Sequence, residues 1–156
     1  MLINYVAGDL FANENHAKAY AVDCNIEGVM NTQMGIAFRQ KYPLMFQEYQ
    51  RRCDAKPPEL KLGEVFLWKG TDGTLVFNVA IQTNRFYSIA QMNIVENAFR
   101  EMRKVADAEG ITSIAMPPIG GGMGNLNWDK SRRALERAFG KWQGRLFVYM
   151  KGVGKW

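Results

Sequence analysis

Apolar and polar positions follow two different periods along the chain. Short apolar runs predict strands, and segments whose apolar residues recur every three or four positions predict amphipathic helices. The predicted strands are LINYVAG (2–8), KAYAVD (18–23), EVFLWK (64–69), TLVFNVAIQ (74–82), ITSIAM (111–116) and RLFVYM (145–150). The predicted helices cover residues 35–42, 44–55, 89–109 and 128–142.

Local signals refine these elements. Pro43 is expected to end the first helix, because proline disfavours a helical conformation at the residue before it. The turn G-T-D-G at 70–73 predicts that the strands on either side of it pair as a hairpin. Gly110 is the expected C-cap of the third helix. The expected inner stripes are Leu44, Met45, Tyr49 and Cys53 in the second helix, and Met92, Val95, Phe99, Met102 and Ala106 in the third.

Strands and helices alternate, with one hairpin in the middle. Alternation of this kind favours an α/β layer structure, with a mostly parallel central sheet and helices on both faces. A chain of 156 residues is expected to form one domain. We assign that domain to residues 1–151 and expect residues 152–156 to be a frayed tail.

Composition narrows the class of protein. With 47% hydrophobic and 22% charged residues, the chain is typical of globular proteins. No stretch approaches the ~20 apolar residues of a membrane span, and the N-terminal MLINYVAGDLF lacks the features of a signal peptide. We therefore expect a cytoplasmic monomer without membrane contact, with free thiols at Cys24 and Cys53. A single histidine, His16, argues against a histidine-based zinc site, so neither a metal nor a cofactor is expected.

Four glycines fall within PPIGGGMGNLNW, residues 117–128, between a predicted strand and a predicted helix. Glycine loses more backbone freedom on folding than any other residue, so such a loop requires a reason. In α/β sheets, ligands bind beyond the carboxyl ends of the strands, where glycines let backbone N–H groups approach an anion. The loop matches neither a Walker A motif nor the GxGxxG fingerprint. A plain flexible connection is the alternative interpretation.

A second loop of this kind, CNIEGVMNTQMG at 24–35, follows the second predicted strand and leads into a helix. Two such loops could close on a diphosphate from two sides. Asp9 follows the first strand, and an aspartate there is suited to cap a turn. Its carboxylate is also suited to accept a hydrogen bond from the exocyclic amine of a purine.

Four segments in order along the chain, YVAGDLF, MGIAFRQKYP, AMPPIGGGMGNLNW and FVYMKG, resemble a macro domain. The similarity is to the branch with the terminal ADP-ribose glycohydrolases, the antitoxins that remove ADP-ribose from DNA, and the ADP-ribose-1″-phosphate phosphatases. It extends from residue 2 to about 151. The resemblance implies a three-layer α/β/α fold with a mixed sheet that binds ADP-ribose, or a related nucleotide, in a crest cleft. ADP-ribosylated nucleic acid or protein is the partner that it implies.

The resemblance also implies roles for individual residues. Asp9 would bind the adenine amino group, Leu10 would give a backbone contact, and Tyr149 would flank the adenine. Asn25 would face the distal ribose, and Thr83 would also bind the ligand. The first phosphate loop would contain Met34, Gly35, Ile36 and Ala37, and the second Ile119, Gly120, Gly121, Gly122, Met123, Gly124 and Asn125.

Two positions depart from the pattern of the glycohydrolase members. Those members place a lysine after the threonine that ends the second hairpin strand, where it attacks the anomeric carbon of the distal ribose, and an aspartate in the second glycine loop assists. In this chain Asn84 and Gly124 stand at these positions. Neither side chain can perform that chemistry, and the neighbouring Arg85 guanidinium stays protonated. We therefore expect lysine-dependent removal of ADP-ribose to be lost or very weak.

The first phosphate loop departs from the family as well. The usual GVMGKGIA has become GVMNTQMGIA, two residues longer. Asn31, Thr32 and Gln33 would either reach over the distal ribose or phosphate, or narrow the cleft and adapt it to another nucleotide.

Two other functions remain open beside binding. The first is a hydrolase with a changed catalytic set, drawn from Asp23, Asn25 and Asn84 with Glu27 nearby, in which a carboxylate activates water. Asp23 is also the type of residue that ends a strand in a turn. The second is a nucleic-acid module, because the net charge is +5 and the pI near 9.3. Phe86 and Tyr87 would then stack on bases beside Arg85, or would instead cover the cleft or core.

Overall fold

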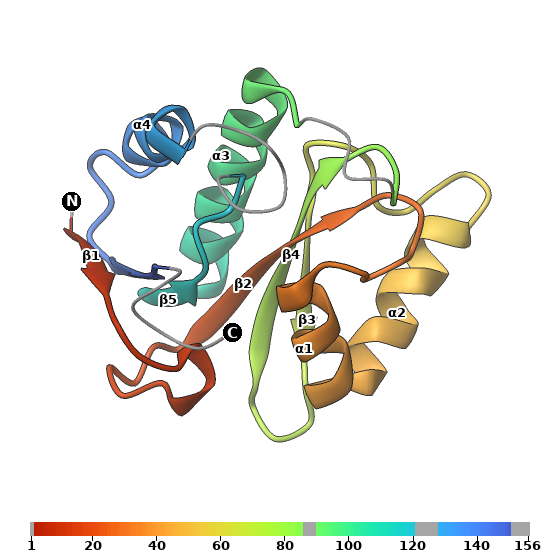
Figure 1. Cartoon of the computed structure of the whole chain (residues 1–156), viewed down its shortest axis with the longest axis horizontal. Helices are drawn as coiled ribbons and strands as arrows, with labels where there is room; N and C mark the ends of the chain where they lie inside the picture. The colour runs from red at the N-terminus through yellow and green to blue at the C-terminus, as the bar shows by residue number, and fades with distance from the viewer. Residues whose placement is uncertain (1, 86–89, 121–127, 151–156) are drawn as a thin grey trace.

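The computed structural model describes residues 2–85, 90–120 and 128–150 (Figure 1). The strands are β1 (Leu2–Val6), β2 (Ala19–Asn25), β3 (Val65–Lys69), β4 (Leu75–Gln82), β5 (Ser113–Met116) and β6 (Arg145–Tyr149). The helices are α1 (Gln33–Lys41), α2 (Pro43–Asp54), α3 (Met92–Glu109) and α4 (Trp128–Ala138), with a 3₁₀ turn, η1, at Leu10–Ala12. The expected tail at 152–156 lies outside the described residues.

The strands form one sheet in the order β1-β6-β5-β2-β4-β3. Every neighbouring pair is parallel except β3 with β4, which are antiparallel and joined by the expected hairpin turn. The sheet is therefore mixed and mostly parallel, as predicted. Because β1, β6, β5, β2 and β4 run the same way, their carboxyl ends meet at one edge of the sheet (Figure 1).

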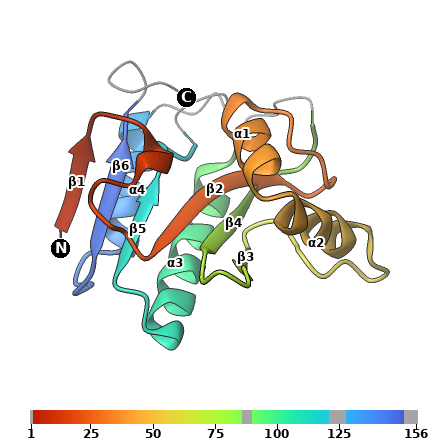
Figure 2. The same ribbon diagram turned by 90° about the horizontal axis from the view of Figure 1, so that it is seen from below.

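The two faces of the sheet are covered by different helices. Phe77, Val79 and Ile81 of β4 belong to the buried cluster that contains the apolar face of α3 and α4. Val76 and Ala80, the alternate residues of the same strand, pack in the cluster that contains α1 and α2. Figure 2 shows β2 and β4 passing between α3 and the α1–α2 pair. The three-layer α/β/α arrangement is confirmed.

Some boundaries and one buried position differ from the sequence-based expectation. β2 continues to Asn25, and α4 ends at Ala138. Leu44, expected on the inner stripe of α2, is 62% exposed. The reason is that Pro43 is the first residue of α2, and the helix turns Met45 and Tyr49, four positions apart, toward the sheet. Leu44 then lies on the outer side.

No helix in the part of the chain that the structure describes is long and apolar enough to cross a membrane.

Candidate functional site

The site residues expected from the sequence gather at the carboxyl edge of the sheet. Asp9 and Leu10 follow β1, Asn25 ends β2, Thr83 and Asn84 follow β4, Ile119 and Gly120 follow β5, and Tyr149 ends β6. Met34, Gly35, Ile36 and Ala37 lie in the first turns of α1, which follows the loop after β2. The remaining expected residues, Gly121, Gly122, Met123, Gly124 and Asn125, lie outside the described residues, as do Phe86 and Tyr87.

The first loop ends in a capped helix. Thr32 is the N-cap of α1, and its Oγ1 accepts a hydrogen bond from the Gly35 N–H at 2.9 Å. Its carbonyl accepts from the Ile36 N–H at 2.8 Å. Within the described residues, the N–H groups of Gln33 and Met34 have no such partner. These are the first two donors of the helix, so they, rather than those of Gly35 and Ile36, are available to an anion at its positive end.

Gly35 allows this cap because it has no side chain. A Cβ at this position would lie 2.9 Å from Thr32 Oγ1 and 3.3 Å from Met30 Cβ. Both distances are shorter than a side chain normally tolerates. The close approach of the loop to the helix therefore favours glycine at this position.

The side chain of Asn25 is used to hold its own loop. It is 4% exposed. Its Oδ1 accepts hydrogen bonds from the Glu27 N–H at 2.9 Å and the Tyr49 hydroxyl at 3.0 Å, while its Nδ2 donates to the Val29 carbonyl at 2.7 Å. The Tyr49 hydroxyl also donates to the Asn25 backbone carbonyl at 2.6 Å, so a residue of α2 holds the end of β2 in place. The second hydrogen of the Asn25 amide has no partner among the described residues.

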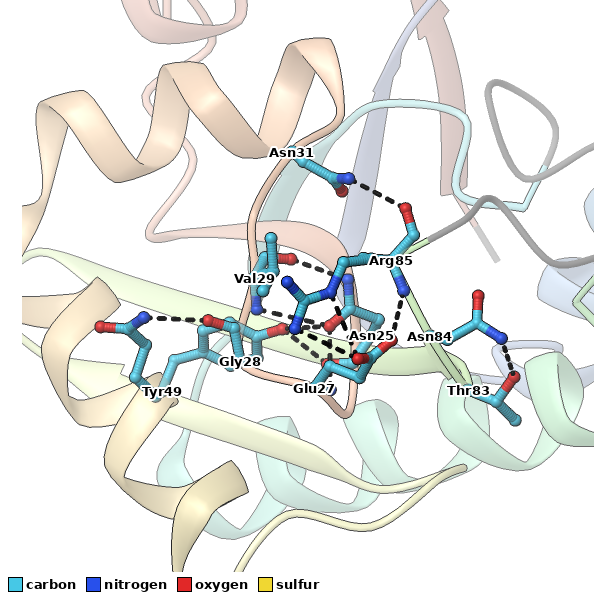
Figure 3. A network of polar contacts seen from close by, with 10 residues as sticks. Asn25, Glu27, Gly28, Val29, Asn31, Tyr49, Thr83, Asn84 and Arg85 are labelled. Atoms are coloured by element: carbon cyan, nitrogen blue, oxygen red, sulfur yellow. Dashed lines mark hydrogen bonds and ion pairs between the residues drawn. The ribbon is translucent and has the colours of Figure 1, made fainter.

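A strap joins this loop to the segment that follows β4 (Figure 3). The Glu27 carboxylate accepts from the Arg85 backbone N–H at 2.7 Å and pairs with its guanidinium at 3.2 Å. Asn31 Nδ2 donates to the Arg85 carbonyl at 2.9 Å. Asn31 and Thr32, two of the residues expected to act on a ligand, thus bond within the protein. No sequence motif predicted this strap, because Glu27 and Arg85 are 58 positions apart and neither belongs to a recognisable pattern.

Asn84 occupies the position next to this strap. Its Nδ2 lies 3.5 Å from Thr83 Oγ1, and Figure 3 shows its amide directed toward Thr83 and away from the Glu27 carboxylate. The next residue, Arg85, has a side chain that is 45% exposed, so its guanidinium group faces solvent. Neither Asn84 nor Arg85 supplies a neutral amine at the end of β4.

Asp23 lies near the end of β2, two residues before Asn25. Its side chain is partly buried, and burial raises the pKa of its carboxyl group. With Asn25, Thr32 and Gln82 it lines a cavity of about 10 Å³, which has room for about one water molecule. Asp23 is in register with Val79, so its side chain lies on the α3 face of the sheet, whereas Met30 and Thr32 of the cavity lie on the α1–α2 face. A carboxyl group with a raised pKa has the character of a general base for a water that reaches it.

The two cysteines are free, as expected, and lie beneath the same loop. Burial raises the pKa of the Cys24 thiol well above its usual value, and it raises the pKa of Cys53 to about 11. Both thiols therefore stay protonated at neutral pH and are poor nucleophiles. No cluster of metal-binding side chains occurs among residues 2–85, 90–120 and 128–150.

The opposite end of the edge contains Asp9, Leu10 and Tyr149. Asp9 caps η1, because its Oδ1 accepts the Phe11 N–H at 2.9 Å, and the carboxylate is exposed. The second carboxylate oxygen has no partner in the described residues. Leu10 and Tyr149 are 1% and 2% exposed, so they form the floor of this end. The Tyr149 hydroxyl accepts from Asn15 Nδ2 at 3.5 Å.

The second loop begins at Ile119 and Gly120. Ile119 is buried, and its carbonyl accepts a hydrogen bond from the hydroxyl of Ser131 in α4. Gly120 has φ +83°, a left-handed conformation that favours glycine. The described start of this loop is therefore fixed to α4, which covers the opposite face of the sheet from α1.

Comparison with known proteins matches residues 21–135 to the model of the macro domain family. The DNA ADP-ribosyl glycohydrolase of Mycobacterium tuberculosis is 27% identical over 140 residues, which are 88% of this chain and 39% of that protein. The ADP-ribose glycohydrolase OARD1 of Homo sapiens is 25% identical over 150 residues, 94% of this chain and 90% of that protein.

Among solved structures, the macrodomain of Mycobacterium tuberculosis DarG superposes with a TM-score of 0.84 at 26% identity, covering 95% of this chain and 97% of that one. The chain spans about two-fifths of the length of the first curated relatives that it matches.

Proposed function

The chain belongs to the macro domain family, and from this premise we propose that it binds ADP-ribose, or a closely related nucleotide, at the carboxyl edge of its sheet. The observation that carries the proposal is the start of α1, where two N–H donors without a described partner stand at the positive end of a capped helix. A helix start of this kind favours a phosphate group. It lies at the same edge as Asp9, Asn25 and Gly120.

The proposed ligand extends along this edge. Its diphosphate lies between the start of α1 and the loop that begins at Ile119. The adenine lies toward Asp9, whose second carboxylate oxygen accepts its amino group, above the floor of Leu10 and Tyr149. The distal ribose lies toward Asn25 and Asn84, beside the Glu27–Arg85 strap.

Calorimetry with ADP-ribose tests the proposal, and Asp9 provides the sharpest variants. Asp9→Ala is expected to weaken binding by about 1–3 kcal/mol, because the adenine amino group is left without its hydrogen-bond acceptor. Asp9→Asn keeps an oxygen that can cap η1 but lacks a second acceptor, so it should weaken binding as well. If only Asp9→Ala weakens binding, Asp9 acts through the cap. A wild-type dissociation constant above about 1 mM, roughly 4 kcal/mol of binding, would exclude the proposed function.

We propose further that removal of ADP-ribose by a lysine nucleophile is lost in this chain. The relatives above are named as glycohydrolases, whereas this chain has Asn84 and Gly124 at the positions that the family resemblance assigns to that chemistry. ADP-ribosylated DNA incubated with the protein should therefore release no ADP-ribose above a buffer control in a gel assay. Rapid release that a cleft mutation abolishes would contradict this proposal.

A hydrolase with a changed catalytic set is the second candidate, and Asp23 favours it. Its raised pKa and its place near the carboxyl end of β2 suit activation of water, which typically contributes 10²–10⁴-fold. The distinguishing assay is release of phosphate from ADP-ribose-1″-phosphate, or of ADP-ribose from an adduct. Turnover that Asp23→Ala abolishes, while calorimetric affinity for ADP-ribose is retained, would assign the chain to this second function.

A further inference from the structure

Basic side chains form a stripe along one flank of α4 and the turn that follows it. Lys130, Arg133 and Arg137 are spaced by three or four positions, so they share one side of the helix. Lys141 lies in the turn that follows, and all four side chains are exposed. The other flank holds Arg132 with both acidic residues of α4, Asp129 and Glu136, with which it pairs. The acidic side chains of the helix are thus kept off the basic flank.

The neighbouring helix α3 continues this basic surface. Arg137 and Arg100 share one acidic partner, Glu96, at 2.6 Å each. Further along α3, Arg100, Arg103 and Lys104 line a groove of about 290 Å³ that reaches Ala138 at the end of α4. We call the stripe and the lining of this groove, together with Glu96 and Asp107, the α3–α4 face.

Both acidic residues of the α3–α4 face already have partners within the protein. Glu96 is shared by two arginines, and Asp107 accepts a hydrogen bond from the Trp142 indole at 2.9 Å. In contrast, Lys104, Lys130, Arg133 and Lys141 form no ion pair with another described residue. The face has seven basic and two acidic side chains, which gives it a formal net charge of +5. The net charge of the whole chain is also +5. The rest of the protein is therefore balanced, and the positive charge is concentrated here.

We propose that the α3–α4 face binds the phosphate backbone of the nucleic acid that carries ADP-ribose. The helical part of the stripe, from Lys130 to Arg137, spans about 10 Å at 1.5 Å per residue, and Lys141 extends it into the following turn, so it is long enough to contact neighbouring phosphates of a strand. It begins at Lys130, next to Ser131, whose hydroxyl donates to the Ile119 carbonyl at the start of the second glycine loop, so a strand held on it leads from the proposed ADP-ribose site. This link to ADP-ribose rests on the proposed function, whereas the backbone contact stands on the charge distribution alone.

The surface suits a nucleic acid better than a protein partner. The large apolar side chains that are exposed in the described chain, Tyr5 and Leu44, lie on β1 and α2. The α3–α4 face thus lacks the apolar centre of a typical protein interface. The aromatic residues that follow α4, Phe139 and Trp142, are buried, so bases have no platform to stack on there. The expected binding is therefore electrostatic and independent of base sequence.

Fluorescence anisotropy with a labelled, unmodified DNA duplex tests this proposal across a series of salt concentrations. The test variant replaces Lys130, Arg133 and Lys141 by glutamine, and the control replaces Lys41, Lys56 and Lys61, exposed lysines on the α1–α2 side, in the same way. The test variant should bind at least tenfold more weakly, and the slope of log affinity against log salt should fall by about 0.9 for each phosphate that the variant no longer neutralises. The control should change affinity less than threefold.

Four further results decide the outcome, one that is expected and three that would overturn the proposal. Both variants should keep the melting temperature and the calorimetric affinity for free ADP-ribose of the wild type, so the proposed function can fail without this proposal failing. Equal losses of DNA affinity in both variants would overturn it, since net charge alone would then explain binding. Absence of wild-type DNA binding at low salt would overturn it too, as would displacement of the duplex by polyglutamate of matched charge as efficiently as by unlabelled DNA.

Discussion

Gly35→Ala is expected to weaken ADP-ribose binding at least tenfold while leaving the protein folded. The added Cβ would meet Thr32 Oγ1 at 2.9 Å, so Thr32 has to move, and the N–H groups of Gln33 and Met34 move with it. The effect on stability should be small, because alanine favours a helix over glycine by up to about 1 kcal/mol, and this offsets the close approach. Calorimetry and thermal unfolding of the same samples separate the two effects.

Gly140→Ala is the matched control for this substitution. Its Cβ would lie 3.4 Å from the nearest atom, the Glu136 carbonyl, which is an ordinary distance at a site away from the carboxyl edge. It should bind ADP-ribose as the wild type does. Thr32→Ala should weaken binding in the same direction as Gly35→Ala, since loss of an N-cap costs about 1 kcal/mol and frees the first turn. Wild-type affinity in Gly35→Ala would mean that α1 does not hold the diphosphate.

The elements that the sequence predicted well are those with a strong local pattern. The apolar spacing of α3 from Met92 to Ala106 identified its buried face, and Gly110 caps it with φ +69°. The hairpin followed from its turn, and the residues proposed for the site follow from a family resemblance that the comparison confirms. The prediction for Leu44 is wrong because Leu44 lies about 100° around the helix from Met45 and farther still from Tyr49, which places it outside the buried face centred on those two residues.

What the sequence could not predict depends on pairing between distant segments. Glu27 meets Arg85 because β2 and β4 are neighbours, with Asn25 in register with Gln82. The order of strands in a sheet is not readable from the periodicity of either strand. The same holds for the N–H groups at the start of α1. Gly35 can be read from the sequence, but its hydrogen bond to the N-cap Thr32 cannot. That bond determines which N–H groups of the first turn are available to a ligand.

Asn25→Ala is expected to lower the free energy of unfolding by about 2–4 kcal/mol, because it removes several buried hydrogen bonds at once. The substitution removes the hydrogen bonds that the Asn25 side chain makes with the Glu27 N–H, the Val29 carbonyl and the Tyr49 hydroxyl. The loop after β2 then loses its anchor, so ADP-ribose binding should also fall at least tenfold. Urea unfolding at pH 7 measures the first effect, and calorimetry the second.

Tyr49→Phe isolates one part of this network. It keeps the buried ring and removes only the hydroxyl that bonds to Asn25 at 2.6 and 3.0 Å, so a loss of about 1–2 kcal/mol is expected. Because the two residues share a bond, the double variant should lose less than the sum of the single variants. Tyr42→Phe, in which the hydroxyl of a half-buried ring is removed, is the control and should change stability by less than about 0.5 kcal/mol. Additive losses for Asn25 and Tyr49 would show that the Tyr49 hydroxyl supports the end of β2 through the Asn25 backbone carbonyl alone and not through the side-chain oxygen.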